Sequence, residues 1–598
     1  MTRTTRPALG GAALLAALVA FTGCTSKSHG PARALWSADA NAVDNPWPSD
    51  RLRAGGLAKT PPGYFAQVLP AGTQFDVPRQ FLDTAAAAIA SNGGFSVYAP
   101  IVVKLSHEID PASLTGVHVY PAGGGTEAAV DIAWTGALDA LLLTPRAPLA
   151  QKTEYVLAIA SPSIQPSPEF TSALASDPAL AALAAAAVAQ GAAASAADLD
   201  LVVSFTTAPV ADDLQKLQAR IDLTLGSALL PNLSSAAPIA NYPVGVFAAG
   251  SSQFTQIFSQ ASANTTGIAA IAQGTWQAFD FRDANDLFDR ALLDGTSLTP
   301  ATTTVDFRLC IPNGTPPAGG WPIVITSHGL TSDSDEAVAR CSSFAKAGIA
   351  VVGQTATDHG FRGSVLTFFD FRRILAVRDE FRQSAGEILQ MQRLLANAKS
   401  NAIAPFDTLD TANPHYWGNS LGALIGGSAI ATSSHFQSSG LSVPGGRLTR
   451  LFEGNAGYGL LTIFANQIGV PPESKEFPDY LVAFRILGQA SVDQADPGAL
   501  APSTPATRKV LLQESLGDAT ILNVASEDLR VAFGFATETV AIDPFTGPGA
   551  MWIWDKTQFP NLPADTDPHN LYWVLPPMRH QMETWILSNG MNLANPPN

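Results

Sequence analysis

The segment of this sequence best suited to covalent chemistry is Gly418-Asn419-Ser420-Leu421-Gly422. The residues before it predict a strand, and the small apolar residues from Ala423 to Ala431 predict a helix after it. A sharp bend between strand and helix needs glycines on both sides of the central residue, because larger side chains would collide there. Such a bend exposes a serine at the edge of a sheet, and Ser420 is therefore the predicted nucleophile.

Negative charge that develops on a substrate oxygen needs hydrogen-bond donors, and two backbone segments can supply them. The amide of Leu421 opens the helix that follows the serine. The second segment, His328-Gly329-Leu330, follows a buried-type strand at 321–326. We predict that the amide of Leu330, or of Gly329, is the second donor. His328 precedes the serine in the chain, so we interpret it as a residue that braces its loop.

A serine nucleophile at such a bend is followed in the chain first by an acid and then by a histidine. Asp518 follows a strand predicted at 509–513, where a carboxylate can orient a base above the sheet. Asp518 is therefore the predicted acid, and Glu514 is its alternative. Asp493 and Asp496 precede that strand, and we interpret them as turn residues.

Two histidines, His569 and His580, lie beyond the predicted acid. His569 is in a loop between a strand at 551–554 and a terminal helix at 577–589, where a base has freedom to reach the serine. His580 lies in that helix and points away from its apolar face. His569 is the predicted base, and His580 remains the alternative.

The elements that must position these residues predict two folded regions. From 266 to 598, strands alternate with longer helices, one of them at about 372–398, which is typical of a mostly parallel sheet covered by helices on both faces. This pattern, together with the serine bend, predicts an α/β-hydrolase fold. Residues 61–210 contain short strands separated by turns and predict an all-β immunoglobulin-like sandwich with an alanine-rich helix at 180–198. Residues 211–265 are the predicted connector.

Two loops of the catalytic region have open interpretations. The segment from Asp358 to Gly363 contains Arg362, and a loop held by an Asp358–Arg362 pair is favoured over a pocket wall. The apolar segment 458–465 has the composition of a lid or acyl-chain wall, but also that of a core helix. The sequence does not decide between these alternatives.

The N-terminus predicts export. Residues 1–23 combine arginines with an apolar run and end in small residues, as a secretory signal peptide does. The junction Phe21-Thr22-Gly23-Cys24 resembles a bacterial lipoprotein signal, which implies lipidation of Cys24 and a lipidated tether at 24–60. It also implies a place on the cell envelope, in the outer membrane and at the cell surface if the host is Gram-negative. An ordinary signal peptide with an incidental cysteine is the alternative.

Composition excludes several other classes of protein. The chain has 46% hydrophobic residues, 14% charged residues and a net charge of −16, so it has material for large cores and would be repelled by nucleic acids. Cys310 and Cys341 are the remaining cysteines, and export permits a disulfide between them. No cluster of cysteine and histidine has the spacing of a metal site, so we predict no metal and no cofactor.

Taken together in their order, these motifs resemble bacterial surface lipoprotein lipases and lysophospholipases of the virulence-factor lipase family, which includes the outer-membrane lysophospholipase of Vibrio. The resemblance implies hydrolysis of acyl lipids by Ser420, Asp518 and His569. It covers most of the chain after the signal peptide. It rests on the segments Phe95–Tyr120, Pro145–Ile159, His328–Leu330, Asp358–Gly363, Arg378–Ser384, Gly418–Gly422, Asp496–Pro497 and Gly517–Asp518.

The sequence thus predicts a carboxylic ester hydrolase whose substrate is an acyl ester or a lysophospholipid. It forms an acyl-enzyme intermediate and associates with a membrane through its lipid. A surface-binding or adhesion lipoprotein with an inactive hydrolase region is one alternative. An extracellular polyester depolymerase is another. The sequence gives neither the acyl length nor the oligomeric state.

Overall fold

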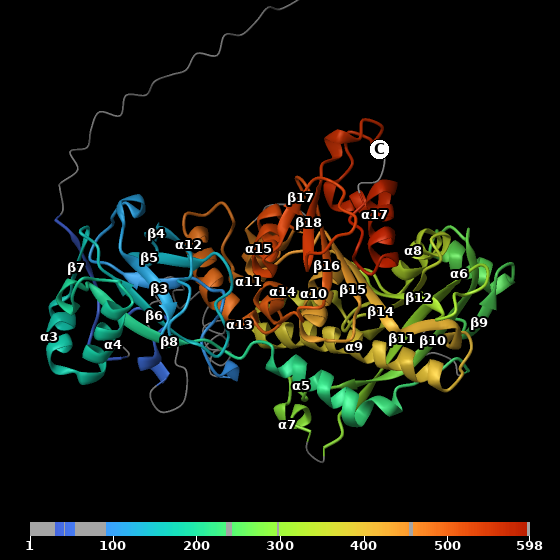
Figure 1. Ribbon diagram of the computed structural model, residues 1–598, viewed down its shortest axis with the longest axis horizontal. Helices are drawn as coiled ribbons and strands as arrows, with labels where there is room; N and C mark the ends of the chain where they lie inside the picture. The colour runs from blue at the N-terminus through green and yellow to red at the C-terminus, as the bar shows by residue number, and fades with distance from the viewer. Residues whose placement is uncertain are drawn as a thin grey trace, which may run out of the picture.

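The computed structural model describes residues 30–40, 42, 44–53, 91–234, 242–295, 298–453 and 459–594. The predicted signal peptide, residues 1–23, and Cys24 lie outside the described residues. The strands gather in two regions, a set of short strands near the N-terminus and one large sheet (Figure 1).

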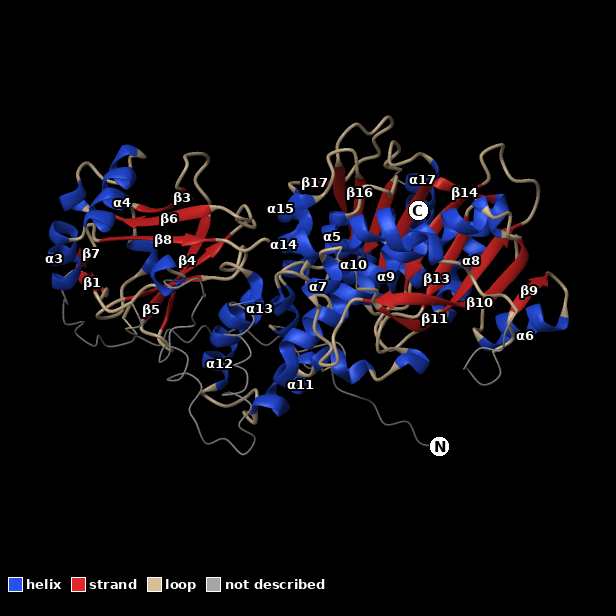
Figure 2. Ribbon diagram, turned by 90° about the horizontal axis from the view of Figure 1, so that it is seen from below, coloured by secondary structure: helices blue, strands red, loops and turns tan. Residues whose placement is uncertain are grey.

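The N-terminal region contains two three-stranded antiparallel sheets. Val102 and Leu141 from one sheet, and Val156 and Phe205 from the other, are fully buried within one hydrophobic core. Figure 2 shows these strands apart from the large sheet. The immunoglobulin-like topology remains a prediction. The strand orders are β2 (Ile101–Lys104), β5 (Ala140–Pro145), β4 (Val130–Thr135), and β3 (Val117–Pro121), β6 (Glu154–Ile159), β8 (Leu201–Thr206).

Part of the predicted tether belongs to this region. β1 (Ala32–Ala34) pairs in parallel with β7 (Ile164–Pro166), and the backbone of Trp47 exchanges hydrogen bonds with that of Val102. The side chain of Trp47 is 1% exposed. The boundary predicted at residue 61 is therefore misplaced, because buried aromatic residues between 32 and 53 complete the core of the N-terminal region.

The alanine-rich segment predicted as a helix at 180–198 is helical in its first part, within α4 (Pro178–Ala189), and ends in the short 3₁₀ helix η3 (Ala196–Asp198). A separate helix, α3 (Pro168–Ser176), precedes it. Asp177 ends α3 and caps α4, because its carboxylate accepts hydrogen bonds from the amides of Ala179 and Leu180. Among the described residues, no single helix has the length and apolar character to cross a membrane. The pair α3 and α4, bent by 98°, meets both criteria only when its two helices are taken together.

The large sheet has ten strands and is parallel from β13 to β17, with three antiparallel strands at its other edge. Strands β12 and β13 are exchanged relative to their chain order, and the others from β9 to β16 follow it. Their order is β17 (Ala536–Glu538), β18 (Gly549–Trp554), β16 (Lys509–Ser515), β15 (Ser438–Ser442), β14 (Leu409–Asn419), β12 (Trp321–Ser327), β13 (Ala350–Gln354), β11 (Ala301–Pro312), β10 (Ile268–Asp280) and β9 (Gly245–Ala248).

Helices cover both faces of this sheet, as predicted. Val324 and Trp417 point to the face covered by α8 (Asp335–Lys346) and α17 (Pro576–Leu587). Their neighbours Ile325 and Tyr416 point to the other face, where α9 (Ile374–Ser400) and α10 (Leu421–Thr432) pack. This alternation is what a strand buried on both sides requires.

The predicted connector is part of the catalytic region. Its strand β9 extends the large sheet, and its helices are α5 (Asp212–Arg220) and α6 (Ser252–Gln260). Asp213 on α5 pairs with Arg382 on α9, which also pairs with Asp379 at 2.7 Å. The buried helix α9 can therefore carry Asp379 and Arg382, because each of them finds an oppositely charged partner.

Two buried carboxylates join the N-terminal region to the catalytic region. Asp493 accepts hydrogen bonds at 2.7 Å from the hydroxyl of Ser96 and the amide of Val97. Asp496 caps α14 (Pro497–Leu500) and accepts from the amide of Arg447, whose side chain donates to the Pro145 carbonyl. These aspartates are more than the turn residues that the sequence predicts, since each is at most 1% exposed and is hydrogen-bonded within the contact between the two regions.

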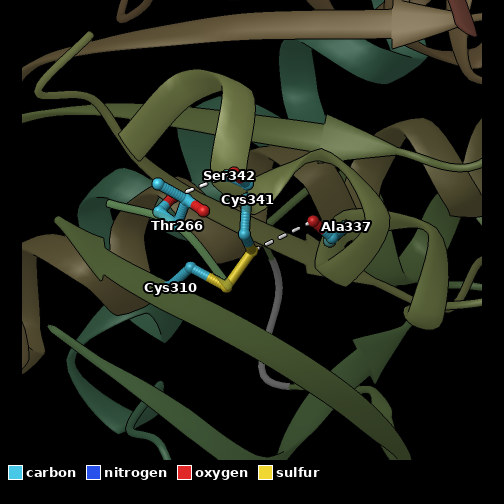
Figure 3. Close-up of a disulfide and its surroundings, with 5 residues drawn as sticks. All are labelled: Thr266, Cys310, Ala337, Cys341 and Ser342. Atoms are coloured by element: carbon cyan, nitrogen blue, oxygen red, sulfur yellow. Dashed lines mark hydrogen bonds between the residues drawn. A yellow bond between two sulfur atoms is a disulfide. The ribbon is translucent and has the colours of Figure 1, made fainter. Parts of the chain in front are cut away.

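A disulfide links Cys310 on β11 to Cys341 on α8, with the two Cα atoms 5.9 Å apart. Next to it, the hydroxyl of Ser342 donates a hydrogen bond to the carbonyl of Thr266 (Figure 3). Both contacts fasten α8 to the antiparallel edge of the sheet.

Candidate active site

Ser420 occupies a sharp bend between β14 and α10. Its φ of 54° and ψ of −122° are uncommon for a residue with a side chain. The bend is closely packed, since a Cβ on Gly418 would lie 2.3 Å from the Gly422 carbonyl oxygen. A Cβ on Gly422 would lie 2.2 Å from the carbonyl oxygen of Ser327. The two glycines thus allow the close approach that presents the serine hydroxyl, and this bend with the strand order above defines an α/β-hydrolase fold.

The structure brings Ser420, His569 and Asp518 together. His569 Nε2 lies 3.0 Å from the Ser420 Oγ, and His569 Nδ1 lies 2.8 Å from Asp518 Oδ2. With Asp518 ionised, Nδ1 carries the ring proton and donates a hydrogen bond to the carboxylate. Nε2 is then free to accept a hydrogen bond from the serine hydroxyl. All three side chains are buried, at about one-twentieth exposed.

Local hydrogen bonds hold the acid and the base in place. Asp518 follows β16, and its second oxygen accepts from the amides of Thr520 and Ile521. His569 lies in η14 (Pro568–Asn570), a short 3₁₀ helix capped by Asp567, whose carboxylate accepts from the His569 amide. The carboxylate and the imidazole are therefore fixed by their own loops.

The alternative acid and base lie elsewhere. His580 is on the surface of α17 with its side chain 61% exposed, and its nearest charged partner is Glu583 at 3.9 Å. Glu514 is buried in β16, and burial raises its pKa to about 7. Among the described residues, neither of them forms a hydrogen bond or ion pair with Ser420 or His569.

The two predicted oxyanion donors have free amides. Ser327 pairs with Gly418 at the end of β12, so the loop that begins at His328 starts beside the serine bend. The amides of Leu330 and Leu421 have no hydrogen-bond partner within the described part of the chain. By contrast, the Gly329 amide donates to Glu336 Oε2 at 2.7 Å. Of the two donors left open by the sequence, Leu330 is therefore the one available.

His328 braces its loop. Its Nε2 accepts a hydrogen bond from the Ala356 amide at 3.0 Å, so Nδ1 carries the proton of the neutral ring. Nδ1 donates to the Gly329 carbonyl at 2.7 Å. His359 packs against His328 with ring centroids 5.0 Å apart, and burial lowers its pKa to about 4. This uncharged pair ties the loop after β12 to the loop after β13.

The loop from 358 to 363 is held by a different ion pair from the one expected. Arg362 binds Glu387 of α9 through two hydrogen bonds of 2.6 Å. Asp358 lies 3.9 Å from Arg282 instead. The sequence could not show this pairing, because the partners are far apart in the chain.

An apolar cavity of about 50 Å³ lies between η8 (Phe371–Arg373), α9, η10 (Leu448–Phe452) and η11 (Phe484–Gly488). Phe464 of α11 (Leu460–Ile468) packs against its wall. The segment 458–465 is therefore helical from Leu460 on and lies near the cavity. Residue 458 lies outside the described residues. The aromatic residues that line the cavity are Phe368, Phe369, Phe371, Phe381, Phe452 and Phe484.

No group of three or more histidine, cysteine, aspartate or glutamate side chains within the described ranges has the arrangement of a metal site.

No family model matches this sequence. No curated protein matches it either. Among solved structures, the chain is similar to an acetyl xylan esterase from Paenibacillus sp. R4, with 13% identity over 63% of this chain and 92% of that chain and a TM-score of 0.36. It is also similar to esterase B from Lactobacillus rhamnosis, with 14% identity over 56% and 91% of the two chains and a TM-score of 0.34. A Pyrococcus horikoshii acylaminoacyl peptidase matches with 14% identity over 48% and 39% and a TM-score of 0.30.

Proposed function

We propose that this protein is a serine hydrolase that cleaves carboxylic esters of acyl groups. The observation that carries the proposal is the hydrogen-bonded row of Ser420, His569 and Asp518, with distances of 3.0 and 2.8 Å. A serine beside a histidine that is itself oriented by a carboxylate is the arrangement that activates a hydroxyl as a nucleophile.

The reaction follows from this geometry. His569 takes the proton of Ser420 as its oxygen attacks the ester carbonyl, and Asp518 stabilises the imidazolium that forms. The free amides of Leu330 and Leu421 stabilise the negative oxygen. His569 then gives the proton to the departing alkoxide, and an acyl-enzyme remains. Water activated by the same histidine releases the acid and restores the serine.

The phenylalanine cavity supports an acyl group as the substrate. Phe368 at its edge lies 4.8 Å from the ring of His359, which packs on His328 of the oxyanion loop. The cavity is also lined by Leu448, which lies shortly after Ser442 in the chain. The Ser442 carbonyl accepts a hydrogen bond from the Ser420 amide. The cavity is apolar, but at about 50 Å³ it has room for only a short alkyl group, so it favours esters of short acyl chains.

The membrane association is also part of the proposal. Lipidation of Cys24 would hold the protein on the cell envelope, in the outer membrane of a Gram-negative host, beside acyl lipids such as lysophospholipids. The chain described from residue 30 begins next to β7, at the end of the N-terminal region. A lipid at Cys24 would therefore place the N-terminal region, rather than the serine, next to the anchor.

The test measures the rate at which the purified protein, residues 25–598, hydrolyses p-nitrophenyl esters of increasing chain length and a lysophospholipid. Ser420→Ala should lower kcat/KM by roughly three or more orders of magnitude. Ser428→Ala is the matched control, since Ser428 lies in α10 and its hydroxyl bonds the Ala495 carbonyl. This control variant should keep nearly all activity.

A wild-type protein that hydrolyses no ester and is not labelled by a fluorophosphonate would contradict the proposal. It would favour a surface-binding lipoprotein. Ester hydrolysis that increases with chain length would assign the enzyme to the lipases, and a preference for short chains would assign it to the esterases.

A further inference from the structure

The peptide group between Gly329 and Leu330 is held more firmly than a surface loop needs. The Gly329 amide donates to Glu336 Oε2 at 2.7 Å, and the Gly329 carbonyl accepts from His328 Nδ1 at 2.7 Å. Both polar backbone groups of one glycine are thus bound by side chains, and the carbonyl also accepts from the Ser332 amide at 3.2 Å. The next amide along the chain, that of Leu330, is left without a partner among the residues described.

Peptide geometry connects these contacts to the oxyanion site. A trans peptide is planar, and its C=O and N–H point in opposite directions. Because His328, together with the Ser332 amide, holds the Gly329 carbonyl, it also sets the direction of the Leu330 amide on the same peptide. Because Glu336 holds the Gly329 amide, it fixes the preceding peptide and prevents the glycine from rotating.

Glu336 is itself fixed. Its Oε1 accepts a hydrogen bond from Arg340, one turn later on α8, and the side chain of Glu336 is 11% exposed. The guanidinium of Arg340 lies 3.6 Å from the ring centroid of Trp417 and 4.0 Å from that of Trp573. Trp417 belongs to β14, three residues before the nucleophile, so the arginine is held against the strand that carries Ser420.

The helix that carries Glu336 is also anchored near its middle. Cys341 joins α8 to β11 through the disulfide, and Ser342 bonds to the Thr266 carbonyl at 2.9 Å (Figure 3). Glu336 therefore reaches the oxyanion loop from a helix that is attached to the sheet covalently.

We propose that Glu336 is a positioning residue for the oxyanion hole, and that Arg340 holds and neutralises it. The proposal rests on the proposed function. A carboxylate close to a developing oxyanion would oppose catalysis by repulsion, but its ion pair with a buried arginine cancels that charge. Glu336 orients the loop, His328 aims the Leu330 amide, and Arg340 removes the electrostatic cost.

The first test compares Glu336→Ala with Glu336→Gln. Loss of the acceptor in Glu336→Ala should lower kcat for a short p-nitrophenyl ester by about 10- to 100-fold with KM nearly unchanged, because the donor matters most in the transition state. Glu336→Gln retains a side-chain oxygen for the Gly329 amide and should recover most of kcat. Affinity for a trifluoromethyl ketone, which mimics the tetrahedral intermediate, should fall in parallel with kcat.

The second test removes the charge balance. Arg340→Met should lower kcat more than Glu336→Gln does, because it leaves an unpaired carboxylate beside the oxyanion site. The double variant Glu336→Gln/Arg340→Met should then be more active than Arg340→Met alone. Asp335→Asn is the control on the same helix, since Asp335 pairs with Arg308 and does not touch the loop. It should keep wild-type kcat.

The outcomes separate the two proposals. Absence of Ser420-dependent hydrolysis in the wild type overturns both of them. Hydrolysis by the wild type with unchanged kcat in Glu336→Ala overturns the positioning role alone. Equal losses of kcat in Glu336→Ala, Glu336→Gln and Asp335→Asn, with equal losses of melting temperature, would show that α8 is needed only for stability and would also overturn it.

Discussion

A buried histidine lies on each side of Ser420, and the two rings differ in their hydrogen-bond partners. On the acid–base side, His569 lies between the carboxylate of Asp518 and the hydroxyl of Ser420. On the oxyanion side, His328 lies between the amide of Ala356 and the carbonyl of Gly329. The rings are 5% and 3% exposed, so burial does not distinguish them.

Their hydrogen-bond partners distinguish them instead. His569 can take the serine proton, because a carboxylate faces its other nitrogen and stabilises the imidazolium. His328 cannot take a proton on Nε2 while that nitrogen accepts a backbone N–H. The comparison shows that the same residue type serves as a base or as a brace according to what faces its second nitrogen.

The largest effect should come from disabling the acid–base side. His569→Ala removes the proton acceptor, and Asp518→Asn removes the charge that orients and stabilises it, so each should lower kcat/KM by roughly 10³- to 10⁴-fold. Steady-state hydrolysis of a p-nitrophenyl ester measures both. A full loss in Asp518→Asn with little loss in His569→Ala would contradict the assignment of the base.

His580→Ala is the matched control for this comparison, because His580 lies on the exposed surface of α17. It should retain activity close to that of the wild type.

The acid–base side was the part most accessible from the sequence. The glycines around Ser420 form a local motif, and the chain order of acid and histidine left two candidates for each role. Asp518 could be favoured over Glu514 because it follows the end of a predicted strand. The parallel sheet and its covering helices were also predicted, since alternation of strands and helices is a local pattern.

The oxyanion side shows what the sequence could not give. Glu336 lies seven residues after Gly329, in a helix whose start and facing direction depend on packing against β13 and β11. Arg362 was expected to bind Asp358 nearby, but its partner Glu387 is on another helix. Such choices depend on tertiary distances, and neither spacing nor composition determines them. The boundary of the N-terminal region was missed for a related reason, because β1 has three residues and its strand partner, β7, is far away in the chain.

A smaller effect should follow from removing the brace. His328→Ala leaves the Ala356 amide without its acceptor and the Gly329 carbonyl with only the longer bond of 3.2 Å from the Ser332 amide. The Leu330 amide is then held less firmly, and kcat should fall by about 10- to 100-fold. The pH dependence of kcat/KM should keep its shape, because His569 still transfers the proton. A displaced or flattened pH profile in this variant would show that His328 exchanges protons during the reaction, and the distinction between the two histidines would then be wrong.

The smallest effect concerns Glu380, which supports the loop fastened by His328. Glu380 on α9 is 2% exposed, and its Oε2 has no hydrogen-bond partner among the described residues. Its pKa is raised to about 8, first by burial and then by the charges of Asp358 and Asp286, while Arg282 and Arg373 oppose the shift. Asp358 lies two residues after Ala356, whose amide binds His328. A charged Glu380 would therefore repel Asp358, and with it the loop on the oxyanion side.

The sign of the pH effect on stability follows from this raised pKa. The folded protein holds the Glu380 proton more tightly than the unfolded chain, whose glutamate has the ordinary value of 4.5. The stabilising contribution is therefore complete below about pH 4.5 and is lost as the pH rises through 8. Glu380→Gln cannot ionise, so it should melt at the same temperature as the wild type at pH 5 and a few degrees higher at pH 9. Parallel melting curves from pH 5 to pH 9 would show that Glu380 is already ionised in the folded protein, and that alkaline pH does not weaken the oxyanion side through this residue.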